Sequence, residues 1–238
     1  MNQNQLPTEF QDVPIEPSPS VSPQILPVTI LKEIRSWAVT SLILGALHLF
    51  VSGFFSAPWG VLLMTVGLAS FYVRSSAMLV VYAVTLAWAG VSNLISGESG
   101  WVGFAVLQFF LVYRVFRNFQ LFRRSESALT EAELSASDLT PARAAAIFPW
   151  AALTLGVLSL VGLVGVFLLA VVLVVVSGSE TVPGFLGFLE GLVVNGGVLG
   201  LALGLASLLC KHPRKGLAIT GMVTGILTLV VEMVLIYL

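Results

Sequence analysis

Charged side chains are scarce in this sequence, and their scarcity excludes a protein that folds in water. Asp, Glu, Lys and Arg make up 10% of the 238 residues, whereas hydrophobic residues make up 57% and the mean hydropathy is +1.00. A soluble domain usually carries about 25% charged residues. The apolar residues also occur in long runs, not in the stripes that cover a soluble core. The predicted fold class is therefore an all-α integral membrane protein with about seven transmembrane helices.

Several chemical classes lack the residues that they need. A single cysteine, Cys210, excludes an internal disulfide and any multi-cysteine metal site. The 11 basic and 12 acidic residues leave no basic excess for a nucleic-acid partner. The His-Glu-x-x-His, Gly-x-Ser-x-Gly and phosphate-loop motifs are missing. His48 and His212 are expected at different depths, which argues against haem. We therefore expect no enzyme, no catalytic residue, no metal and no cofactor.

The chain is predicted to divide into four parts. Residues 1–31 are rich in Pro, Gln and Ser and are expected to form a disordered cytoplasmic tail, and their composition does not match a cleaved secretory signal. Residues 32–117 are predicted to form a four-helix transmembrane unit, residues 118–147 a cytoplasmic linker with a short helix, and residues 148–238 a three-helix Gly-rich unit. Each crossing needs roughly 20 residues to span about 30 Å of hydrocarbon. The seven apolar segments are Trp37–Phe55, Trp59–Val73, Ala77–Ile95, Trp101–Phe116, Phe148–Val176, Phe185–Leu209 and Leu217–Leu238.

The polar interval carries two helix-start patterns. Thr130 and Glu133 have the spacing of a capping box, which predicts a short surface helix. Thr140 followed by Pro141 suits an N-cap and the first helical position. The next helix is expected to enter the membrane near Phe148.

The distribution of basic residues predicts the orientation. With seven crossings and the tail inside, all 11 Lys and Arg residues fall on one side, and the opposite loops carry only Glu98 and Glu180. The positive-inside rule places the basic side in the cytoplasm and the C-terminus outside. Trp and Tyr residues at the predicted helix ends agree with this orientation, since both prefer the membrane interfaces. A bacterial plasma membrane is the expected location.

Glycine is dense in the last three apolar segments. Small residues at four-residue spacing let helices approach closely inside lipid. Tight packing within one chain is favoured over a homodimer face, although both interpretations stay open. The candidate packing residues are Gly196, Gly200, Gly204, Gly221 and Gly225.

The segments ALTLGVLSLVG, GVLGLALGLASLL and KHPRKGLAITGMVTGILTLV carry a resemblance to a known family. Residues 151–238 resemble a bacterial membrane family known only as a domain of unknown function (number four-one-nine-zero), with Gly216 to Gly221 matching the start of its last helix. The resemblance implies Gly-rich helices and a bacterial membrane. It implies no chemistry, and the four N-terminal helices resemble nothing known to us.

Polar residues inside the apolar segments are the candidates for function. His48, Asn93 and Gln108 could meet as an intramembrane polar cluster, either as interhelical hydrogen bonds or as a proton relay. Glu190 and Glu232 are both expected within about two helical turns of the outer surface. If they face each other, they form a candidate ion or proton site; otherwise they reach the outer headgroups.

The basic loop before the last segment is the third candidate. His212 is expected to join Lys211, Arg214 and Lys215 in a charge cluster that faces lipid headgroups.

The missing motifs favour a non-enzymatic scaffold, accessory or regulatory subunit whose tail and linker meet cytoplasmic partners. The alternative is a small transporter or channel with a carboxylate site in the outer leaflet. Expected partners are the lipid bilayer and either another membrane protein or a second copy of the chain.

Overall fold

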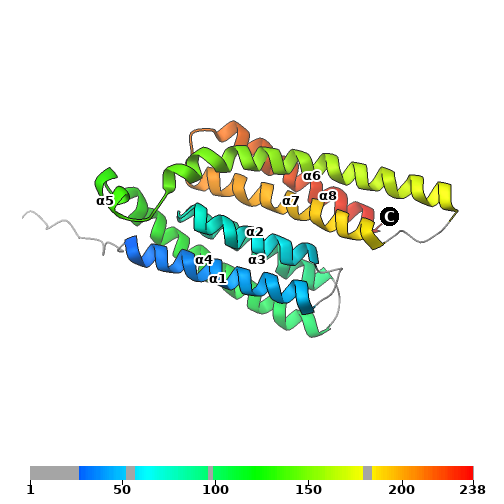
Figure 1. The fold of residues 1–238 in the computed structure, drawn as a ribbon, viewed down its shortest axis with the longest axis horizontal. Coiled ribbons are helices and arrows are strands. Elements are labelled where there is room, and N and C mark those ends of the chain that lie inside the picture. Colours follow the sequence, from blue (N-terminus) through cyan, green and yellow to red (C-terminus); the bar gives the residue numbers. More distant parts are fainter. Residues whose placement is uncertain (1–26, 52–56, 96–98, 179–183, 238) are drawn as a thin grey trace, which may run out of the picture.

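The structure, a computed structural model, describes residues 27–51, 57–95, 99–178 and 184–237, and these residues form eight α-helices and no strand. Seven helices run along the long axis of the molecule, and α5 lies at one end (Figure 1). The prediction of an all-α fold is confirmed. The helices are α1 (Pro27–Val51), α2 (Ala57–Tyr72), α3 (Ala77–Ile95), α4 (Ser99–Ala128), α5 (Glu131–Ala136), α6 (Pro141–Ser177), α7 (Gly184–Leu209) and α8 (Lys215–Tyr237).

Helix α7 is the centre of the arrangement. α6, α7 and α8 pack closely on one another, and α7 also packs on α2 and α3. The N-terminal half consists of two helical hairpins, α1 with α2 and α3 with α4, with few contacts between α2 and α3. The two hairpins also meet directly, since Ser70 on α2 and Tyr82 on α3 share a hydrogen bond of 2.6 Å and all four helices contribute to one apolar core.

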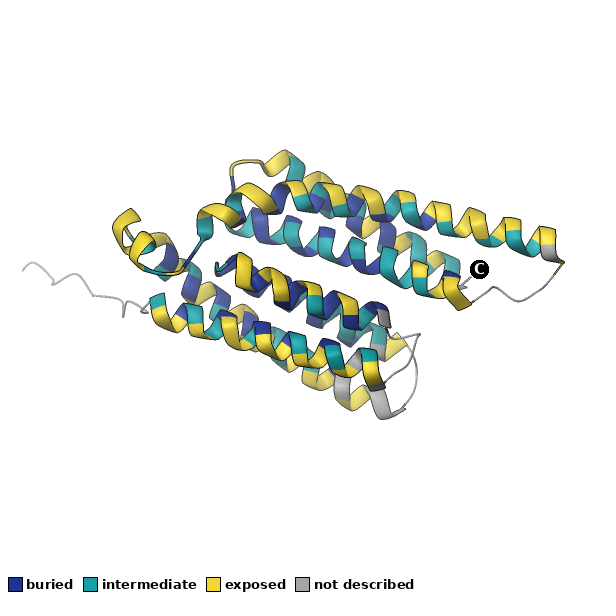
Figure 2. Ribbon diagram, in the orientation of Figure 1, coloured by how far each residue is buried: buried dark blue, intermediate teal, exposed yellow. Residues whose placement is uncertain are grey.

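Three helices are long and apolar enough to cross a membrane: α6, α7 and α8. Among the described residues, α2 and α3 are apolar but shorter, so helix length and composition do not establish seven crossings. The half of α6 farthest from α5 is mostly exposed, whereas α7 is largely buried or half-buried (Figure 2). An exposed, almost wholly apolar helix is stable in lipid and not in water.

Two helices begin or end elsewhere than predicted. α1 begins at Pro27, inside the segment predicted as disordered tail, because Ile30 and Ile34 are fully buried. α4 continues twelve residues past Phe116 to Ala128, since Phe119 and Phe122 pack in the same core. α6 begins at Pro141, as the Thr140–Pro141 pattern predicts, and the proline has no N–H to leave unsatisfied. Residues 1–26 of the predicted tail lie outside the described residues.

The five candidate packing glycines lie where α6, α7 and α8 approach one another. A Cβ at Gly200 would lie 2.8 Å from the backbone N of Gly156 on α6, and one at Gly204 would lie 2.6 Å from the backbone O of Ala218 on α8. Gly196 faces Ser159, Gly221 faces Ala152, and Gly225 faces Gly197, all within the chain. Gly196 meets the Ser159 hydroxyl, and the other four glycines meet backbone atoms, so these positions leave no room for a side chain.

Gly200→Ala should therefore lower the unfolding midpoint in detergent, because the added methyl meets backbone that cannot move aside. Overpacking of this kind costs about 1–3 kcal/mol. Gly187→Ala on the same helix is the matched control, since a Cβ there meets nothing within 4 Å. That control should be neutral or stabilising by up to about 1 kcal/mol through helix propensity. Equal effects of the two substitutions would contradict the packing role.

Candidate functional site

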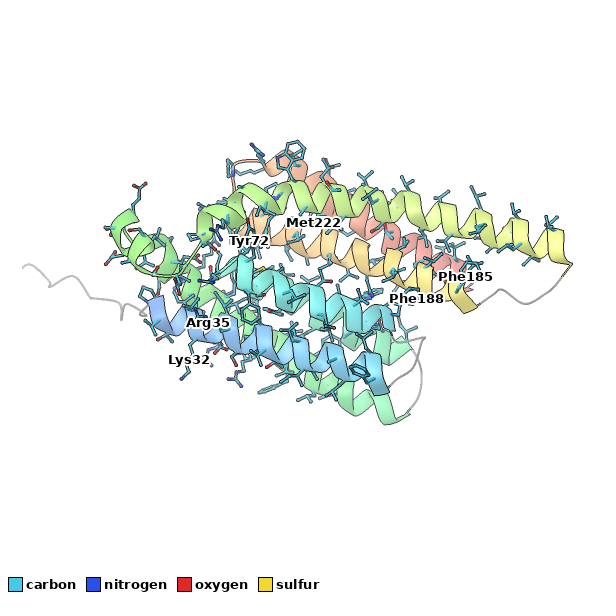
Figure 3. The ribbon with its side chains drawn as sticks, viewed as in Figure 1. Lys32, Arg35, Tyr72, Phe185, Phe188 and Met222 are labelled. Atoms are coloured by element: carbon cyan, nitrogen blue, oxygen red, sulfur yellow. The ribbon has the colours of Figure 1, made fainter. Side chains whose placement is uncertain are left out.

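We use "basic end" for the end of the molecule formed by α5, the α2–α3 turn and the α7–α8 turn, where Lys32 and Arg35 also lie (Figure 3). Asp138 accepts from Arg35 at 3.2 Å and pairs with Arg74 at 3.4 Å. Two hydrogen bonds of 2.7 Å join Thr140 and Arg74. The Thr140 N–H donates to the Arg74 carbonyl, and the Arg74 N–H donates to the Thr140 hydroxyl. Glu33 on α1 accepts from Asn118 on α4 at 2.9 Å. The polar interval is thus attached to α1 and to the α2–α3 turn.

Glu126 is the most buried charged side chain in this region. It lies near the end of α4, is 8% exposed, and reaches the turn that precedes α3. Its carboxylate accepts from the Ser75 hydroxyl at 2.9 Å, from the Ser76 backbone N–H at 3.0 Å and from the Ser76 hydroxyl. Burial raises the pKa of Glu126, and the three hydrogen bonds oppose that rise. Glu126 therefore ties the end of α4 to the two serines whose own oxygens bond the first N–H groups of α3.

The α7–α8 turn brings three further groups to the same place. After Leu209 the chain forms a Schellman-type turn, in which the His212 N–H donates to the Ser207 carbonyl and Lys211 adopts a left-handed φ of 56°. Burial, together with the charge of Glu126, raises the pKa of the Cys210 thiol to about 12, so this thiol is protonated and a poor nucleophile.

A hollow of about 440 Å³ lies between these elements. It is lined from α4 by Arg123 and Glu126, from the α2–α3 turn by the two serines, from the start of α6 by Pro141 and Ala142, and from the last turn by Cys210, Lys211 and His212. Among the described residues, no group of three or more His, Cys, Asp and Glu side chains could hold a metal ion.

The prediction that His212 faces lipid headgroups is wrong. His212 is 8% exposed, its ring meets Phe148 edge-on at 6.4 Å between centroids, and its Nε2 atom has no hydrogen-bond partner among the described residues. Burial lowers the pKa of His212 and favours the neutral ring. The turn folds the histidine inward, while Lys211, Arg214 and Lys215 stay exposed.

Near the opposite end, the side chains of Glu190 on α7 and Glu232 on α8 lie beside each other. One oxygen of Glu232, Oε2, is buried without a partner among the described residues. Glu232 lines a hollow of about 310 Å³ with Trp59, Trp88 and Asn195, and Glu190 lines an apolar one of about 390 Å³. The two residues are adjacent; an ion or proton site stays a prediction.

The predicted intramembrane polar cluster falls largely outside what the structure describes. The side chains of His48 and Asn93 lie outside the described residues, and Gln108 is half-buried on α4. A contact between the side chains of His48, Asn93 and Gln108 therefore stays a prediction.

No protein-family model matches the chain, and no curated protein or solved structure matches it either. The resemblance of residues 151–238 to the family of unknown function therefore stays a prediction.

Reasoning from the sequence missed Glu126, although one signal was available. Ser75 and Ser76 are adjacent hydroxyl donors in a short turn between two apolar segments, so they needed an acceptor from elsewhere in the chain. The sequence cannot tell which of the acids in the polar interval reaches them.

The raised pKa of Glu126 predicts a pH-dependent stability. A carboxyl with a raised folded-state pKa stabilises fully below its ordinary value of 4.5, and this contribution is lost as the pH rises through the raised value. Glu126→Gln keeps an acceptor for Ser76 and removes the charge. The unfolding midpoint of the unmodified protein should therefore fall relative to that of the variant as the pH rises from 4.5.

Glu133 is the matched control of opposite sign. Hydrogen bonds from Thr130 lower the pKa of Glu133, so its contribution is lost as the pH falls. The unfolding midpoints are measured in detergent as the pH rises from 4.5. The assignment would be contradicted if the midpoint difference between the unmodified protein and Glu126→Gln did not change with pH.

Proposed function

We propose that the chain is a seven-crossing protein of a bacterial plasma membrane that acts as a non-enzymatic scaffold, accessory or regulatory subunit. The orientation follows from charge: the N-terminal end of α1, the α2–α3 turn, the polar interval and the α7–α8 turn all belong to the basic end. Their Lys and Arg residues favour the cytoplasm. The bacterial location rests on the family resemblance alone.

Seven crossings also fit the way the helices lie. Successive long helices run in alternate directions along one axis, which is the course of a chain that passes repeatedly through a bilayer (Figure 1). α2 has 16 residues and α3 has 19, so both span about 24–29 Å at 1.5 Å per residue. This length approaches the hydrocarbon thickness of about 30 Å when the flanking residues are added.

The observation that carries the scaffold proposal is the hydrogen-bonded build of the basic end. Asp138 and Thr140 tie the polar interval to α1 and to the α2–α3 turn. Arg143 adds a contact to Tyr72, with its guanidinium 5.0 Å from the ring centroid. α5 has no buried residue, so a fixed helix with exposed acids at Glu131 and Glu133 is presented at the membrane surface. A fixed exposed surface of this kind suits a partner protein better than a flexible linker does.

A transporter or channel is the second candidate, favoured by the contact between Glu190 and Glu232. Paired carboxyls within apolar helices are rare and commonly mark ion or proton paths. The hollows on either side give such a path room.

Topology is tested by a reporter fused after Leu238, which should report an external C-terminus because α8 leaves the basic end at Lys215. A reporter inserted after Ser137 should report the cytoplasm. A cytoplasmic signal from both positions would contradict seven crossings.

The scaffold role is tested by purifying the full chain from its native membrane in mild detergent and identifying stoichiometric partners by mass spectrometry. Glu131→Lys combined with Ala136→Lys changes the exposed face of α5 and should release the partner without changing the unfolding midpoint. Lys215→Glu, equally exposed at the basic end, is the control and should retain it. If the chain purifies without any partner, and proteoliposome ion flux is lost in Glu190→Gln with Glu232→Gln, the transporter replaces the scaffold.

A further inference from the structure

We propose that the hollow at the basic end binds a phosphate group, carried either by an anionic lipid headgroup or by a soluble phosphate compound. The hollow is walled by α4, the α2–α3 turn, the start of α6 and the α7–α8 turn. Three independent features of its walls favour an anion.

The first feature is the N-terminus of α6. Thr140 occupies the N-cap position but makes no side-chain cap, because its hydroxyl accepts from Arg74 instead. The start of a 37-residue helix is thus left without a side-chain acceptor, and Pro141 and Ala142 line the hollow. Pro141 has no N–H, and the Arg143 and Ala144 N–H groups donate to the Thr140 carbonyl, so the N–H that this turn offers to a ligand is that of Ala142. A helix N-terminus binds phosphate through such an N–H and through the helix dipole.

The second feature is an excess of positive charge. Arg123 and Lys211 both line the hollow, and neither has an ion-pair partner among the described residues. The acid beside them, Glu126, has its oxygens engaged by Ser75 and Ser76. Basic pockets between helices at the cytoplasmic side bind phosphate-bearing headgroups.

The third feature is a buried polar atom without a partner. His212 lines the hollow, and its Nε2 atom is buried and unbonded among the described residues. An unsatisfied buried nitrogen is destabilising, because it has lost its hydrogen bond to water and gained none in the protein. A phosphate oxygen would satisfy it, since the neutral ring can place its proton on Nε2.

The Lys211 position allows a variant that keeps the fold. Lys211 holds a left-handed φ of 56°, which glycine adopts without strain. Lys211→Gly should therefore leave the unfolding midpoint unchanged or raised in the absence of phosphate, and weaken phosphate binding about tenfold or more. Lys215→Ala removes a charge from the first residue of α8, outside the hollow, and should leave the affinity unchanged.

The experiment measures the unfolding midpoint of the full chain in detergent with inorganic phosphate, against chloride at equal ionic strength. The same measurement is made in nanodiscs of phosphatidylglycerol and of phosphatidylcholine. Stabilisation by inorganic phosphate assigns a soluble ligand, and stabilisation by phosphatidylglycerol alone assigns a headgroup. Either result supports the proposal when Lys211→Gly removes the stabilisation. The proposal would be overturned if neither probe stabilised the chain, or if Lys211→Gly and Lys215→Ala reduced the stabilisation equally.

Discussion

The contact between Glu126 and the start of α3 determines how the basic end is built. α2 and α3 are joined by a turn of four residues, Val73 to Ser76, whose two serines bond the first N–H groups of α3. The Ala77 N–H donates to the Ser75 hydroxyl at 3.3 Å, and the Met78 and Leu79 N–H groups donate to the carbonyls of Ser75 and Ser76. The two serines are held in turn by α4, which returns along α3 and continues past the apolar segment to place Glu126 on them. The aromatic side chains of Phe119 and Phe122 hold this extension in the core. The polar end therefore depends on one carboxylate supplied by a residue distant in sequence.

Magnitudes separate this contact from the ion pairs around it. Asp138 is more than half exposed, and exposed ion pairs contribute about 0–1 kcal/mol each. Hydrogen bonds to a buried carboxylate contribute about 1.5–3 kcal/mol, and losing the carboxylate would leave the Ser76 N–H unsatisfied. The ion pairs therefore orient the polar interval, whereas Glu126 stabilises the join between α3 and α4. In the half of the molecule formed by α6, α7 and α8, the glycines of α7 stabilise the join between helices by close backbone approach instead of hydrogen bonding.

Apolar runs and local motifs were sufficient to predict where the long helices lie. The capping box of Thr130 and Glu133 is confirmed, because both partners are three residues apart. Predictions failed where the partner is distant in sequence. α1 starts earlier than composition indicates, because Ile30 and Ile34 find a core formed by other helices. Thr140 occupies the predicted N-cap position of α6, but its hydroxyl does not bond the helix, because it accepts from the Arg74 N–H, 66 residues away. Likewise, His212 was predicted to be exposed from its basic neighbours, but a left-handed Lys211 turns it inward.

Among the described residues, the buried acid Glu126 and the half-buried acids Glu190 and Glu232 differ in a way that bears on function. Glu126 is surrounded by donors, two hydroxyls and a backbone N–H, so its burial is explained by the hydrogen bonds that it accepts. Glu232 has another carboxyl, Glu190, as its contact and one buried oxygen without a partner among the described residues. A packing role at that position would be filled at lower cost by an apolar residue, since α7 and α8 are otherwise apolar there. The acid pair near the far end therefore calls for a chemical explanation, while Glu126 has a structural one.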